Sequence, residues 1–97
     1  MKKRAYLIKV KNNGQMQELF VVKILNNNRK TMEKIEVAIK NKFTDLLFVK
    51  LANTTILPFE NKPTTPHEPC AIFNYKFLLE NGETEDVELF AHVLDLH

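Results

Sequence analysis

Two Asn-Gly pairs constrain the fold of this chain more than any other feature, because each predicts a tight turn between two β-strands. The pairs are Asn13-Gly14 and Asn81-Gly82, and they contain both glycines of the 97-residue sequence. Asn-Gly accepts the positive φ angles that hairpin turns require, since glycine lacks a Cβ and asparagine visits the left-handed region at low cost. Strand-like sequence flanks each pair. The sequence therefore predicts two hairpins, one from residues 4–11 and 16–25 and one from residues 70–79 and 84–94.

The length of each turn sets which residues face each other across the hairpin. A two-residue loop in the first hairpin places Lys9 opposite Glu18, a favourable charge pair, and Ile8 opposite Leu19. In the second hairpin, a loop with Gly82 as a left-handed bulge collects apolar side chains on one face and opposes unlike charges, which a two-residue loop does not. The sequence favours the bulged register, with the pairs Tyr75–Val87, Phe73–Leu89 and Lys76–Asp86.

One amphipathic helix is predicted between the hairpins, because apolar residues recur there at helical spacing after Asn28, which can cap it. The apolar face consists of Met32, Ile35, Ala38, Ile39 and Phe43. The opposite face carries Lys30, Glu33, Lys34, Lys40 and Asn41. Residues 45–51 then predict a buried strand, and residues 54–59 extend it or form a short edge strand that ends at Pro58.

These elements predict a single α+β domain over residues 1–97, with the order ββα, β, long loop, ββ. One helix packed on a mixed or antiparallel sheet of about five strands is the economical architecture. A β-grasp-like arrangement has this element order, as do many other small folds. Residues 19–25 (LFVVKIL) are apolar on both faces, which predicts a central strand or one covered by a partner. A homodimer and a cover formed by the loop 60–70 explain this second apolar face equally well.

Several residue types are scarce or missing, and their absence excludes classes of function. The chain has no serine, so it is not a serine-nucleophile enzyme, and two glycines are too few for a phosphate-binding loop. One cysteine cannot form an internal disulfide, which predicts a reducing, cytoplasmic setting. The sequence has no apolar run near the roughly eighteen residues that would span a membrane.

The charges are divided unevenly along the chain. Residues 1–50 carry twelve basic and four acidic side chains, whereas residues 51–97 carry two basic and eight acidic ones. Five carboxylates lie within nine residues at the second hairpin: Glu80, Glu83, Glu85, Asp86 and Glu88. Such a cluster repels itself, so a protein partner with a basic groove would relieve that repulsion.

Two other interpretations of the charges remain open. In one, the two halves neutralise each other within a single fold and the charges solvate the surface. In the other, the basic half binds nucleic-acid phosphates. The candidate phosphate contacts are Lys2, Lys3, Arg4, Arg29, Lys30, Lys34 and Lys40.

The segment 60–70 (ENKPTTPHEPC) contains three prolines together with His67 and Cys70. With His92 and His97 these residues offer a weak metal site, and Cys70 beside His92 offers a thiol nucleophile with a base. Zinc sites of paired Cys-x-x-Cys type have a far more specific pattern. The sequence therefore favours a proline-stiffened surface loop, which is also the second candidate contact surface, and predicts no metal and no cofactor.

Taken together, these patterns predict a non-enzymatic protein-binding module that acts through the acidic hairpin, with nucleic-acid binding as the alternative. Small size, the lack of a catalytic constellation and a composition rich in Lys, Asn and Ile would suit an accessory or inhibitor protein of a phage or mobile element.

Overall fold

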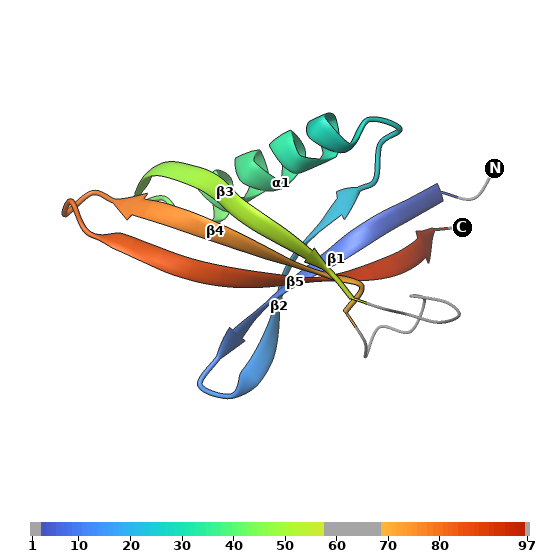
Figure 1. The fold of residues 1–97 in the computed structure, drawn as a ribbon, viewed down its shortest axis with the longest axis horizontal. Helices are drawn as coiled ribbons and strands as arrows, with labels where there is room; N and C mark the ends of the chain where they lie inside the picture. Colours follow the sequence, from blue (N-terminus) through green and yellow to red (C-terminus); the bar gives the residue numbers. More distant parts are fainter. Residues whose placement is uncertain (1–2, 58–68, 97) are drawn as a thin grey trace.

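The computed structural model describes residues 3–57 and 69–96, which form one five-stranded sheet and one helix, as the sequence predicts. The elements are β1 (Lys3–Asn12), β2 (Gln15–Lys23), α1 (Asn28–Lys42), β3 (Leu46–Ile56), β4 (Ala71–Leu79) and β5 (Thr84–Leu96). The strand order is β2-β1-β5-β4-β3, and every neighbouring pair is antiparallel. The sheet is therefore antiparallel rather than mixed, with β5 in its centre and β2 and β3 at its edges (Figure 1).

The first hairpin has the predicted two-residue turn. Asn12 pairs with Gln15, and Asn13 and Gly14 between them both have positive φ angles, 52° and 81°. Lys9 faces Glu18 as predicted. The predicted pairing of Ile8 with Leu19 is wrong, because the register shifts next to Ile8, which faces Phe20 and leaves Leu19 as the extra residue of a β-bulge.

The bulged register of the second hairpin is confirmed. Gly82 has a φ of 86°, which glycine adopts without steric cost. The three predicted pairs, Tyr75–Val87, Phe73–Leu89 and Lys76–Asp86, are all present.

Helix α1 begins one residue earlier than expected, because Asn27 and not Asn28 is its N-cap. The Asn27 side-chain oxygen accepts hydrogen bonds from the backbone N–H groups of Arg29 (2.9 Å) and Lys30 (3.3 Å). The predicted apolar face packs against the sheet: Ile35 and Ile39 are buried, and Met32, Ala38 and Phe43 are half-buried against them.

The core lies between α1 and the face of the sheet that it covers. Alternate residues of β4, namely Phe73, Tyr75 and Phe77, point into it and meet Ile35 and Ile39 of the helix. Each of these large side chains contributes about 1.5–3 kcal/mol by leaving water. Aromatic rings also pack edge-on against each other: the ring centroids of Tyr6 and Phe73 lie 5.9 Å apart.

The central strand β5 pairs with β4 and with β1 over different parts of its length. Its first residues, 84–88, pair only with β4, and its last, 92–96, pair only with β1. The two hairpins therefore diverge, and Figure 1 shows their turns pointing in different directions. Helix α1 contacts both edge strands, β2 and β3, so the sheet curves around it.

Two predicted positions change because of this strand order. The segment 19–25 was expected to be a central strand or one covered by a partner; the central position is wrong, because β2 is an edge strand, in which Val22 is buried and Val21 is 53% exposed. The segment 45–51 was expected to be buried, but β3 is the other edge strand and Phe48 is exposed. Of the two alternatives for residues 54–59, the structure shows the extension, since β3 continues to Ile56; Pro58 and residue 59 lie outside the described residues.

Candidate functional site

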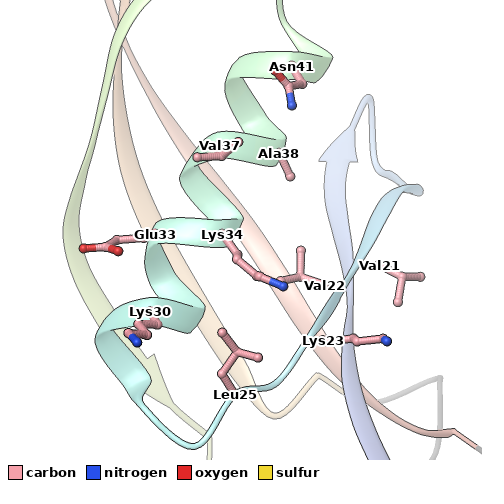
Figure 2. Close-up of a pocket in the computed structure, with 10 residues that line it drawn as sticks. All are labelled: Val21, Val22, Lys23, Leu25, Lys30, Glu33, Lys34, Val37, Ala38 and Asn41. Atoms are coloured by element: carbon pink, nitrogen blue, oxygen red, sulfur yellow. The ribbon is translucent and has the colours of Figure 1, made fainter.

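A shallow, open groove of about 630 Å³ lies between α1 and the edge strand β2. This volume lies within the ~300–1,000 Å³ that is usual for ligand sites. Apolar side chains in it are Val21, Val22, Leu25, Val37 and Ala38. Polar side chains in it are Lys23, Lys30, Glu33, Lys34 and Asn41. Figure 2 shows Lys34 extending from α1 toward Val22, with Ala38 on the same side of the helix.

The β2 side of this groove is a strand edge whose backbone groups point outward. Ile24 donates its backbone N–H to the carbonyl oxygen of Arg4 (3.0 Å), so Ile24 faces β1. In an antiparallel ladder every second residue bonds to the same neighbour, so Val22 also faces β1, and Val21 and Lys23 face away from it. Within residues 3–57 and 69–96 no strand pairs with this outer edge of β2.

The helix closes the end of that edge. Leu25 continues the alternation and points its N–H outward, where the hydroxyl of Thr31 accepts it at 3.0 Å. Thr31 is itself buried, and its hydroxyl donates to the carbonyl oxygen of Asn27 at 3.2 Å. The open part of the edge therefore ends at Lys23, beside the first turns of α1.

Two large apolar side chains are exposed along the groove. Val21 on β2 is 53% exposed and Val37 on α1 is 58% exposed. Their helix and strand neighbours Ala38 and Val22 are less accessible. Because Val22 points toward α1, the side chain of Val21 projects from the opposite face of the sheet, and Val22 and Ala38 supply the apolar surface between strand and helix (Figure 2).

The charges around the groove are mainly positive. Lys23, Lys30 and Lys34 line it, and within the described part of the chain none of them forms an ion pair. The one carboxylate there, Glu33, lies 3.6 Å from the Arg29 guanidinium, measured from Oε1 to Nε. The groove therefore carries uncompensated positive charge above an apolar floor.

The structure brings together only part of the basic set named from the sequence. Lys30 and Lys34 line the groove, whereas Lys40 is exposed outside it and Arg29 is engaged with Glu33. Arg4 is exposed on β1, which is separated from α1 along the chain by β2. Lys3 begins β1, and Lys2 lies outside the described residues.

The five acidic residues are exposed, but they do not share one face. Asp86 and Glu88 pair with Lys76 and Asn74, on the face of the sheet away from the helix. Glu85 pairs with the buried Phe77, so it points to the other face. Glu80 and Glu83 flank the turn.

Glu85, Asp86 and Glu88 line a second cleft, which separates the start of β5 from the tip of the first hairpin. Lys11 and Lys42 line the same cleft. Acidic and basic side chains therefore mix there, in contrast to the groove beside β2.

Cys70 lies just before β4, half-buried against the core. Its backbone N–H donates to the carbonyl oxygen of Ala91 at 2.7 Å. Burial raises the pKa of the Cys70 thiol, which lowers the fraction of reactive thiolate at neutral pH.

The ladder between β4 and β5 ends with Ala71 opposite Ala91, the residues next to Cys70 and His92. The described register places the buried His92 opposite Leu7 on β1. Among the described residues no group of three or more His, Cys, Asp and Glu side chains lies close enough to hold a metal ion. His67, His97 and the loop 60–70 up to residue 68 lie outside those residues.

No protein-family model, curated protein or solved structure matches this chain. No helix of the described residues has the length and apolar character needed to cross a membrane.

The sequence signals for this groove were incomplete. The basic helix face was visible in the spacing of Lys30 and Lys34. Val21 and Lys23 were missed as its opposite wall, because only the strand order places β2 at an edge beside α1.

Proposed function

We propose that this chain is a small non-enzymatic protein-binding module, and that its principal contact surface is the groove between α1 and β2. One observation carries the proposal: the exposed apolar side chains of Val21 and Val37 line a groove that is bordered by a strand edge with no pairing strand among the described residues. Contiguous exposed apolar surface with a polar rim is typical of protein-interaction sites. A cytoplasmic setting, which the single cysteine favours, is part of the proposal.

The acidic hairpin is the second candidate surface. Its five carboxylates are exposed and available to a basic partner. It ranks behind the groove because the carboxylates divide between two faces of the sheet and lie beside Lys11, Lys42 and Lys76. An accessory or inhibitor role of the phage type stays an expectation from composition.

Nucleic-acid binding is the alternative of a different class, and Lys23, Lys30 and Lys34 along one groove favour it. Phosphate backbones are bound by clustered positive charge, and such binding weakens steeply with salt. The apolar floor between these lysines offers nothing to phosphates, which is why protein binding is the better supported of the two.

The test is a selection of binding peptides from a random displayed library, followed by substitution in the groove. We expect selected peptides to lose affinity for Val37→Asp, since a charge on the apolar wall must be desolvated on binding. Leu47→Asp is the matched control, because Leu47 on β3 is 55% exposed, close to the 58% of Val37. Recovery of no binding peptide, or equal loss with both variants, would contradict the proposal.

A further inference from the structure

The groove beside β2 has the features of a site that accepts an additional β-strand. Resting on the proposed function, we infer that its partner is an extended segment of another protein that alternates apolar and acidic residues and pairs with the free edge of β2. Strand addition of this kind derives affinity from main-chain hydrogen bonds and specificity from side-chain contacts on alternate residues.

The main-chain part of this inference rests on Val21 and Lys23. Both residues direct their N–H and carbonyl groups away from β1, into the groove. Thr31 satisfies the next outward N–H, that of Leu25, so the helix defines where an added strand must stop. The edge is thus open over a defined stretch and closed at one end.

The apolar part rests on the position of α1 alongside the edge. A strand added to β2 would lie alongside α1, where Figure 2 shows Ala38 and Lys34 on the side of the helix toward β2, and every second side chain of that strand would face this side. The opposite face of the added strand would continue the surface that holds the exposed Val21. Apolar residues at alternate positions of the partner fit this arrangement.

The charges that border the groove favour an acidic partner. Lys23, Lys30 and Lys34 border the same stretch, and the nearby Glu33 is engaged with Arg29. Lysine stems are long enough to cover apolar surface while their ammonium groups reach carboxylates at the rim. Acidic residues in the partner would steer its approach and reject basic competitors.

Among the described residues, the other strand edge without a partner is that of β3, and its ladder is less regular. Its ladder with β4 is interrupted by two register shifts, between Leu46 and Phe48 and between Leu51 and Asn53. Such irregularities are a common means of blocking strand addition. Along β2 the single shift lies next to Ile8, before the open stretch at Val21 and Lys23.

The experiment is a titration of the ¹⁵N-labelled protein with an end-capped nine-residue peptide that alternates glutamate and valine. We expect the amides of Val21 and Lys23 to become protected from hydrogen exchange when the peptide binds. The Lys30→Glu/Lys34→Glu double variant should weaken binding by about tenfold, since two attractions become repulsions. Lys40→Glu, on the same helix but outside the groove, is the matched control and should bind as the unaltered protein does.

A separate variant tests the main-chain hydrogen bonds between β2 and the added strand. Val21→Pro removes one outward N–H, and proline is tolerated at such edge positions because the ladder to β1 is left intact. It should abolish the peptide's binding, whereas Thr54→Pro on the β3 edge should not. A peptide N-methylated at alternate amides serves as a second measurement that does not depend on the folding of any variant, and it should fail to bind.

Three outcomes would overturn the inference. Binding of the N-methylated peptide, or of a lysine–valine peptide as tightly as the glutamate–valine one, would exclude an acidic added strand. Protection of Val21 and Lys23 in the protein alone, rising with its concentration, would make a second copy of the chain the occupant. Displacement of the peptide by mixed-sequence single-stranded DNA with a steep salt dependence would assign the groove to nucleic acid.

These results are distinguishable from failure of the proposed function. If library-selected peptides bind through Val37 but are helical or basic, the chain remains a protein-binding module and only the added-strand inference falls. If no peptide of any kind binds, both fall together.

Discussion

The backbone N–H of Leu25 donates a hydrogen bond to the hydroxyl of Thr31, 3.0 Å away. This contact ties the end of β2 to the first turn of α1, and it fixes the distance between the two walls of the groove at one end. Thr31 is 1% exposed, so this acceptor is held in place by the packing around it.

We expect Thr31→Val to destabilise the fold by about 1–2 kcal/mol, because the replacement keeps the shape and leaves the Leu25 N–H without its acceptor. Thr31→Ser keeps the hydroxyl and should retain the hydrogen bond. Urea unfolding of both variants measures the difference. An equal loss in both would mean that the methyl group of Thr31, and not its hydroxyl, stabilises this junction.

The helix cap gives a second prediction. Asn27→Ala removes the acceptor for the N–H groups of Arg29 and Lys30 and should cost about 1 kcal/mol of unfolding free energy. Asn28→Ala should cost little, since Asn28 is exposed and inside the first turn. Denaturant midpoints for the two variants compare neighbouring residues of identical type. The reverse ranking would move the start of the helix to the position that the sequence suggested.

Tyr75 predicts a dependence of stability on alkaline pH. Burial, reinforced by the charge of Glu36, raises the pKa of its phenol above the ordinary value of 10.0. The folded protein therefore holds this proton more tightly than the unfolded chain, and stability should fall as the pH rises above about 10, where only the unfolded form ionises freely. Below that pH the contribution is constant.

Tyr75→Phe tests both the pH effect and the phenol's environment. The buried Tyr75 hydroxyl has no hydrogen-bond partner among the described residues, so its removal should stabilise the fold by up to about 1 kcal/mol at neutral pH. The variant should also lose less stability between pH 9 and pH 11 than the unaltered protein. Tyr6, whose pKa burial also raises, is present in both proteins, so its contribution to the pH dependence is common to the two measurements. Destabilisation at neutral pH would show that the hydroxyl is satisfied.

Cys70 should react slowly. Because burial raises its pKa, iodoacetamide at pH 7.5 should alkylate the folded protein more slowly than the urea-unfolded chain. Mass spectrometry over time measures both rates. Faster reaction in the folded state would indicate an activated thiol and revive the thiol-nucleophile interpretation.

Neutralising the acidic hairpin separates the two candidate surfaces. We expect Glu85→Gln/Asp86→Asn/Glu88→Gln to leave peptide capture by the groove unchanged, since these residues line the other cleft. Neutral replacements are preferred to lysine because Asp86 faces Lys76, and a lysine there would repel it. Loss of capture with an unchanged circular dichroism spectrum would make the hairpin the principal contact.

How much of the structure could be predicted from the sequence depends on how far apart in the chain the interacting residues lie. The second hairpin was predictable because Gly82, the alternation of Phe73 and Tyr75, and the Lys76–Asp86 pair all favour one register. The helix cap was misplaced because Asn27 and Asn28 are chemically identical and adjacent. The bulge beside Ile8 has no local signal at all.

Strand order was the larger gap, and the site depended on it. An apolar pattern such as that of residues 19–25 indicates that both faces carry apolar side chains, and it does not indicate whether strands, a helix or solvent lies beside each face. The basic helix face was therefore predicted, while Val21 and Lys23 became part of the same surface only through the antiparallel order of all five strands.

The position of β5 also has a consequence for how the chain acquires this fold. It is the last of the five strands to leave the ribosome, and it is the one that joins β1 to β4. Until it is synthesised, the first hairpin and the β3–β4 segment have no common partner, and the inner edges of β1 and β4 are unpaired. Pairing of β1 with β5 spans almost the whole chain, a high contact order that slows folding. The nascent protein therefore exposes two additional strand edges for a time, and those edges, rather than the permanent edge of β2, are where chaperones would be needed.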